Sequence, residues 1–186
     1  QGLQPGDAIV LTKPVGTGTL FAAEMRAKAR GRWIDAAIQS MLVSSQAAAE
    51  CLQRYGATAC TDLTGFGLVG HLVEKTRASE VDAVLTMEAI PLLDGALETV
   101  RAGILSSLQP QNLRLRRAIH DIEQASTHPA FPLLFDPQTA GGLLAGVPQD
   151  RVSACVDELH ALGYSQAVVI GRVEPLSDRQ APIRIN

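Results

Sequence analysis

Residues 57–78 place the strongest restriction on how this chain can fold. An apolar stretch, Ala57 to Cys60, runs into Asp62 and then into a short segment with three glycines. An apolar run with helical spacing follows, made of Leu68, Val69, Leu72 and Val73. This order predicts a strand, a tight loop and a helix N-terminus, where unpaired N–H groups and the positive end of the helix dipole attract anions. The segment therefore predicts contact with phosphate.

Apolar periodicity predicts the other elements of the fold. Strands are expected at 7–12, 57–60, 81–87, 143–147 and 167–173, with an edge strand at 183–185. Helices are expected at 19–30 (stopped by Gly31), 33–55 (stopped by Gly56), 66–78, 94–102 (stopped by Gly103) and 149–162, with a weaker helical segment at 113–125. Because strands and helices do not alternate strictly, we expect an α+β fold in residues 1–186, a mixed β-sheet with helices packed on it, rather than a doubly wound parallel sheet.

Charge and cysteine content narrow the class of protein. The formal net charge of −3 and the absence of a strongly basic stretch argue against nucleic acid as a partner. No apolar run is long enough to cross a membrane, and the N-terminal residues lack the pattern of a secretory signal. The three cysteines, Cys51, Cys60 and Cys155, are odd in number and widely spaced, which predicts buried free thiols and a cytoplasmic location.

The glycine segment also matches a dinucleotide-binding pattern. Gly65 to Gly70 reads G-x-G-x-x-G, and Glu88 lies about 20 residues further on. In a dinucleotide fold the glycines directly follow the first strand, whereas here Asp62-Leu63-Thr64 intervenes. We therefore do not favour a nicotinamide or flavin site, and the chain has no P-loop motif.

Asp62 has two interpretations from spacing alone. It is either a turn acid that accepts local N–H bonds or a metal ligand presented to phosphate, and the spacing favours the turn acid. Thr64 is expected to cap the following helix, and His71 is expected to be packed or hydrogen-bonded rather than catalytic. The Asp136–Gly142 segment is expected to be a structural turn.

Three segments together resemble one enzyme family. Residues 61–72, TDLTGFGLVGHL, are similar to the T-D-[VL]-T-G-F-G-L-x-G-H-L signature of selenophosphate synthetases, also called selenide, water dikinases. Residues 136–144, DPQTAGGLL, resemble their D-P-Q-T-S-G-G-L-L, with Ala140 in place of the usual Ser. Residues 11–18, LTKPVGTG, resemble their L-T-K-P-L-G-x-G. The motifs occur in the family's order and extend over nearly the whole chain.

The resemblance implies that the active-site residues are divided between two domains. The family belongs to the aminoimidazole ribonucleotide synthetase-like group, and residues 1–186 look like its C-terminal domain. An N-terminal domain would carry the catalytic Cys or selenocysteine and most ligands of ATP and Mg²⁺. The metal-binding Asp of the family falls on Asp62, and Thr64, Gly65 and Gly67 would lie near the ATP phosphates.

The same resemblance implies the reaction and the partners. Selenide, ATP and water would give selenophosphate, AMP and phosphate, with no catalytic residue in this chain. The partner would be the protein's own N-terminal domain, in a full-length homodimer, with the isolated piece a monomer or weak dimer. The alternatives are another ATP-using synthetase or kinase of the same superfamily and a non-catalytic module that binds a nucleotide or a partner protein.

Overall fold

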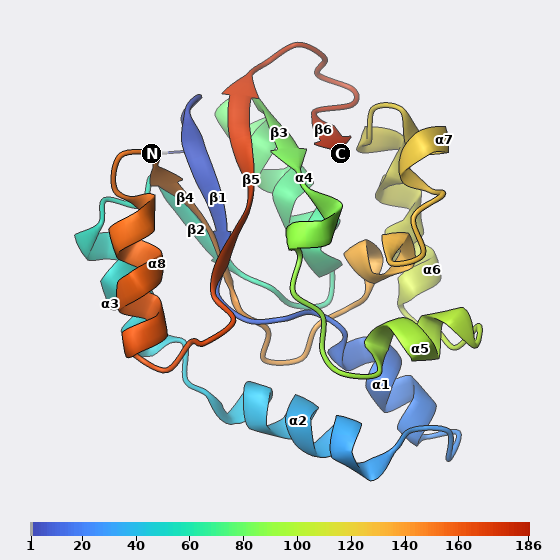
Figure 1. The fold of residues 1–186 in the computed structure, drawn as a ribbon. Helices are drawn as coiled ribbons and strands as arrows, with labels where there is room; N and C mark the ends of the chain where they lie inside the picture. The colour runs from blue at the N-terminus through green and yellow to red at the C-terminus, as the bar shows by residue number, and fades with distance from the viewer. Residues whose placement is uncertain (1) are drawn as a thin grey trace.

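The computed structural model describes residues 2–186 and consists of one six-stranded sheet with helices around it (Figure 1). The strands are β1 (Asp7–Leu11), β2 (Ala59–Asp62), β3 (Val81–Leu85), β4 (Leu143–Pro148), β5 (Val168–Pro175) and β6 (Ile183–Ile185). The α-helices are α1 (Thr17–Glu24), α2 (Gly31–Leu42), α3 (Gln46–Arg54), α4 (Gly67–Ser79), α5 (Ala96–Arg101), α6 (Gln109–Asn112), α7 (Ile122–Ala125) and α8 (Val152–Ala161). Short 3₁₀ helices are η1 (Met87–Ala89), η2 (Leu113–Ala118) and η3 (Phe131–Phe135).

The sheet has the order β2-β4-β1-β5-β3-β6. Four neighbouring pairs are antiparallel, and only β3 and β6 run parallel. The predicted α+β fold with a mixed sheet is therefore confirmed. The strands on either side of α4, β2 and β3, are not neighbours, whereas a dinucleotide-binding βαβ unit joins parallel strands of one sheet half. The sheet topology therefore differs from that of a dinucleotide-binding fold.

The sheet is covered on both faces, and β1 shows this most clearly. All five residues of β1 are buried. Ala8 and Val10 pack in a cluster with α3 and α8, while Ile9 and Leu11 pack in the larger cluster that includes α4. Because successive side chains of a strand point to opposite faces, a continuous apolar run is what a doubly covered strand requires. Figure 1 shows α3 and α8 on one side of the sheet and α4 on the other.

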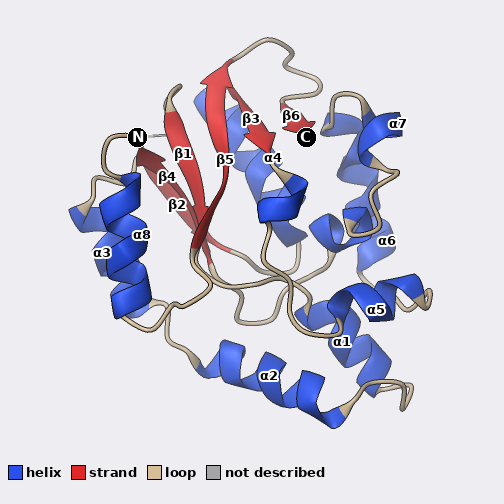
Figure 2. Ribbon diagram, viewed as in Figure 1, coloured by secondary structure: helices blue, strands red, loops and turns tan. Residues whose placement is uncertain are grey.

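Three predicted helical segments have different bounds in the structure, as Figure 2 shows for the α-helices. The expected segment 113–125 is divided into η2 and α7. The expected helix 33–55 is divided into α2 and α3, with a break at Val43 to Ser45. The expected helix 19–30 ends at Glu24, where the chain turns through Ala27 in a left-handed conformation with φ 52°. Gly31 therefore begins α2 instead of stopping the helix before it.

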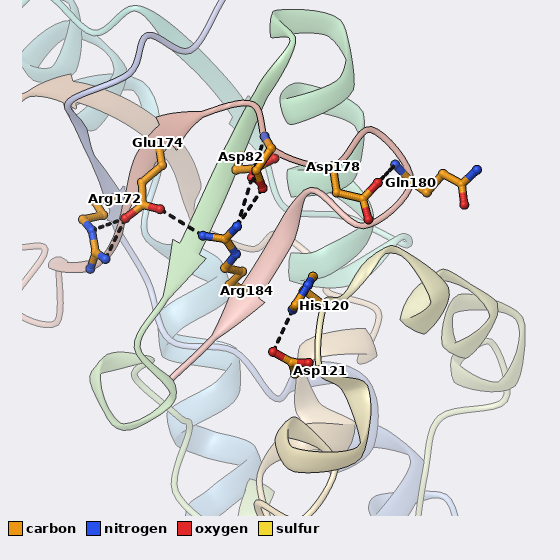
Figure 3. Close-up of polar contacts among 9 residues, drawn as sticks. Asp82, His120, Asp121, Arg172, Glu174, Asp178, Gln180 and Arg184 are labelled. Atoms are coloured by element: carbon orange, nitrogen blue, oxygen red, sulfur yellow. Dashed lines mark hydrogen bonds and ion pairs between the residues drawn. The ribbon is translucent and has the colours of Figure 1, made fainter.

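Charged side chains fix the C-terminal edge of the sheet (Figure 3). Asp82 on β3 is 1% exposed and accepts hydrogen bonds from the backbone N–H and the hydroxyl of Ser177. Arg184 on β6 lies 3.8 Å from Asp82 and 3.3 Å from Glu174 of β5. These contacts hold the short strand β6, predicted as an edge strand, against β3.

The cysteine prediction is right for two residues and wrong for the third. Cys51 and Cys155 are buried free thiols between α3 and α8. Cys60 is exposed, because β2 is an edge strand whose alternate residues face solvent. Within residues 2–186 no helix has both the length and the apolar character that crossing a membrane requires.

Candidate functional site

The three motif segments come together at one end of the sheet. β1 and β2 both end there, and β4, which is antiparallel to both and lies between them, begins there. The loop after β1 (residues 12–16), the loop after β2 (residues 63–66) and the loop before β4 (residues 136–142) therefore adjoin. In Figure 1 this end of the sheet faces α1, α2 and α5. Segments more than 100 residues apart in sequence form one structural unit.

Asp62 is the last residue of β2 and its side chain is exposed. Its cross-strand partner is Leu143, the first residue of β4. Among residues 2–186 its carboxylate accepts no hydrogen bond and forms no ion pair. The turn-acid interpretation requires local N–H donors to this carboxylate, so the geometry does not support it. An exposed carboxylate without an internal partner is free to bind an external cation.

Thr64 does not cap α4, which corrects the expectation from sequence. The helix begins at Gly67, preceded by Phe66, and has no side-chain cap. Instead the backbone N–H of Thr64 donates to Nε2 of His71 at 3.0 Å, and the Thr64 hydroxyl lies 3.1 Å from the same nitrogen. His71 is 5% exposed, and burial lowers its pKa, with the nearby charge of Asp62 opposing this. The expected packed, hydrogen-bonded role of His71 is confirmed.

Gly65 and Gly67, both predicted to lie near phosphate, differ in whether their backbone N–H groups are already hydrogen-bonded. Gly67 is buried with φ 71°, and a Cβ there would lie 2.9 Å from the carbonyl carbon of Phe135. Its N–H donates to the Thr64 carbonyl at 3.1 Å. Gly65 is exposed, and within residues 2–186 its N–H and that of Phe66 have no acceptor. The open backbone donors beside Asp62 are therefore those of Gly65 and Phe66.

The loop of residues 136–142 holds the other two loops in place. Gln138 donates its backbone N–H to the Thr64 carbonyl at 3.0 Å. Its side-chain oxygen accepts from the backbone N–H of Gly16 at 3.0 Å and from the Thr17 hydroxyl at 3.2 Å. Asp136 accepts from the N–H of Gly18 at 3.0 Å. The loop contains a bend and connects the other two loops, which agrees with the structural role expected of it, and sequence reasoning missed which loops Gln138 joins.

Asp136 is completely buried in this junction. Its Oδ2 accepts from Gly18 and from the Gln138 amide, whereas Oδ1 has no partner. Burial raises the pKa of Asp136 to about 7, although the hydrogen bonds from Gln138 and Gly18 work in the opposite direction. The carboxyl group therefore changes protonation near neutral pH, inside the contact that joins the loops.

No complete metal site lies within the described part of the chain. Residues 2–186 contain no cluster of three or more His, Cys, Asp or Glu side chains arranged to hold a metal ion. Mg²⁺ commonly keeps several waters and takes only one or two carboxylates together with substrate phosphates. A single exposed carboxylate such as Asp62 is compatible with this small number of carboxylate ligands.

Comparison with protein families and known proteins gives a consistent result. The family model for the AIR synthase related protein, C-terminal domain, matches residues 4–180. Selenide, water dikinase 2 of Peptoclostridium acidaminophilum is 34% identical over 172 residues, which are 92% of this chain and 49% of that protein. Selenide, water dikinase of Desulfitobacterium hafniense is 36% identical over 179 residues, 94% of this chain and 51% of that protein. The chain spans about half the length of these relatives.

Solved structures confirm the fold. A hydrogenase maturation protein HypE superposes with a TM-score of 0.66 at 20% identity, covering 97% of this chain and 49% of HypE. Thiamine monophosphate kinase from Aquifex aeolicus gives a TM-score of 0.60 at 19% identity, covering 100% of this chain and 52% of the kinase. The chain belongs to the AIR synthase-related family, of which it contains the C-terminal domain.

Proposed function

We propose that this chain is the C-terminal domain of an ATP-dependent selenide, water dikinase, which makes selenophosphate, AMP and phosphate from selenide, ATP and water. The observation that carries the proposal is the exposed, unpartnered Asp62 carboxylate beside the open N–H groups of Gly65 and Phe66. Sequence identity favours this activity within the family. It is 34% and 36% with two selenide, water dikinases over more than nine-tenths of the chain, against 20% and 19% with the HypE and thiamine monophosphate kinase structures.

In this proposal Asp62 would be one ligand of a magnesium ion, and the loop of residues 63–66 would lie near the ATP phosphates. Bound Mg²⁺ would neutralise the negative charge of the polyphosphate. The N–H groups of Gly65 and Phe66 can donate to phosphate oxygens at the start of α4. Thr64 and Gly67 act indirectly, since their N–H groups are already used within the loop and hold its shape.

The remainder of the active site would belong to an N-terminal domain. That domain would supply the catalytic Cys or selenocysteine and most ligands of ATP and magnesium, and it would form the homodimer. The three-loop end of the sheet would close over the phosphates. Asp62 would then be the contribution of the C-terminal domain to a shared site.

The isolated chain is expected to have no turnover. Residues 2–186 contain no cluster of three or more side chains that could hold a metal ion, and the nucleophile would lie in the other domain. The measurement is AMP formation from ATP and Mg²⁺ with and without selenide, for the isolated 186 residues and for the full-length protein. We expect selenide-dependent AMP only from the full-length protein.

Two results would redirect the proposal. Selenide-dependent AMP formation by the isolated chain would contradict the shared site. ATP binding by titration calorimetry without turnover of any kind by the full-length protein would instead favour a non-catalytic nucleotide-binding module.

A further inference from the structure

A polar pocket of about 420 Å³ lies next to the three loops but outside the Asp62 site. Its walls come from the loop after β1, from α2, from the segment before α5 and from the loop between α8 and β5. In Figure 1 these segments meet where α2 passes beneath the end of the sheet. Its polar side chains include Lys13, Gln39, Ser40, Asp94, Ser165 and Gln166. The volume falls within the range of small-molecule sites.

Lys13 is the unusual member of this lining. Its side chain is 5% exposed, and its ammonium group donates to the carbonyl of Val43 at 2.6 Å and to that of Ala140 at 3.3 Å. It forms no ion pair with any carboxylate of residues 2–186. Burial lowers the pKa of Lys13, which reflects the cost of keeping this charge away from water.

The two carbonyl partners leave the ammonium group of Lys13 with one free N–H donor. An ammonium group has three N–H donors, and the two carbonyls take two of them. A buried cation without a counter-charge is costly, and a carboxylate or phosphate oxygen would supply that charge together with a strong hydrogen bond. Asp94, the one acid in the lining, is exposed to solvent, so it does not serve as this partner.

We propose that this pocket binds a small molecule through an anionic group, phosphate or carboxylate, that pairs with Lys13. The neutral side chains of Gln39, Ser40 and Gln166 can bind the rest of the molecule, since each donates and accepts hydrogen bonds. The proposal does not rest on the activity proposed above.

The pocket and Asp62 are close but separate. Thr12, next to Lys13, bonds to Leu143 of β4 through its N–H, and Asp62 is the cross-strand partner of the same Leu143 from the other side. Two strand spacings therefore separate the backbones, about 10 Å. Lys13 also donates a hydrogen bond to the carbonyl of Ala140, in the same loop as Asp136. A ligand on Lys13 would thus lie beside the three-loop junction, in a pocket whose lining does not include Asp62.

The test is a nitrogen-15 NMR titration of the chain with inorganic phosphate and, separately, with acetate, at constant ionic strength adjusted with sodium chloride. We expect saturable shifts for at least one anion in the amides of Gly163 to Gln166 and of Gln39 and Ser40. The anion that binds more tightly identifies the anionic group of the natural ligand. Absence of saturable shifts with both anions, or shifts confined to other surfaces, would overturn the proposal.

Three variants separate a binding role of Lys13 from a purely structural one. Lys13→Met should weaken anion binding about tenfold or more, the loss expected for one charged hydrogen bond. Lys28→Met, the same change at an exposed lysine, should leave binding unchanged. Ala36→Phe should block the pocket from α2 while both carbonyl bonds of Lys13 remain, and it should therefore weaken anion binding. This variant tests the proposal if Lys13→Met does not fold. Unchanged anion affinity in a folded Lys13→Met or in Ala36→Phe would show that Lys13 only has a structural role, as a hydrogen-bond donor to the carbonyls of Val43 and Ala140.

Discussion

Replacing Asp62 with asparagine in the full-length protein is expected to lower selenide-dependent AMP formation by about 100-fold or more, because a metal ligand contributes several kcal/mol of charge stabilisation. The amide keeps the size of the side chain but loses the negative charge that a hard cation requires. Because the Asp62 side chain is exposed and has no internal partner among residues 2–186, folding should be unaffected. The measurements are the AMP formation rate as a function of Mg²⁺ concentration and the thermal unfolding midpoint.

The matched control is Asp150→Asn. Asp150 is also an exposed acid, but it follows β4 at the opposite end of the sheet from Asp62. This variant should keep wild-type rates and the wild-type magnesium dependence. Wild-type rates in Asp62→Asn would show that Asp62 is not a metal ligand. A loss of activity that coincides with unfolding would assign it a structural role.

The stability of the chain is expected to fall as the pH rises from about 4 to about 7, through the titration of Asp136. The folded-state pKa of this carboxyl is raised from 3.8 to about 7 by burial. Between these two values the folded chain holds a proton that the unfolded chain has released, so raising the pH favours unfolding. At 1.36 kcal/mol per pKa unit, the contribution is on the order of 4 kcal/mol and levels off above the folded-state pKa.

The Asp136→Asn variant isolates this effect from other titrating groups. Its side-chain oxygen can still accept from the N–H of Gly18, but it does not ionise. Urea unfolding at a series of pH values should show the wild type losing stability relative to the variant as the pH rises. Leu134→Met, a volume-conserving change two residues away, should differ from the wild type by a pH-independent amount. A constant difference between wild type and Asp136→Asn would contradict the protonated state of Asp136 in the folded chain.

The sheet was predictable because its strands are governed by local pattern. β4 and the part of β1 after Asp7 are apolar, and both strands are buried on two faces. The helix at 67–79 was predictable for the same reason, since Leu68, Val69, Leu72 and Val73 all enter the core. Where burial alone determines an element, the sequence pattern is sufficient.

The break between α2 and α3 was not predictable because distant residues create it. Lys13 donates to the carbonyl of Val43, and the Tyr164 hydroxyl donates to the carbonyl of Ser44. These carbonyls would otherwise accept N–H groups of a continuous helix. Ala-rich segments favour the helix locally, but tertiary hydrogen bonds end it.

The candidate site shows the same division between local and distant causes. The motif predicts Asp62 as a metal ligand, and the structure shows its carboxylate exposed at the end of β2, where such a role remains open to the test above. The cap at Thr64 was wrong because α4 begins later, at Gly67, and the N–H and hydroxyl of Thr64 contact His71 instead. Gln138 was missed because its partners, Gly16 and Thr17, lie more than 100 residues away.

The most direct test is phosphorus-31 NMR of the products made by the full-length protein from ATP, Mg²⁺ and selenide. We expect AMP, orthophosphate and a selenium-bound phosphorus signal that splits with selenium-77, all formed about 100-fold more slowly by the Asp62→Asn variant. Formation of ADP without a selenium-bound phosphorus signal would contradict this expectation, and would assign the chain to a different ATP-using enzyme of the same family.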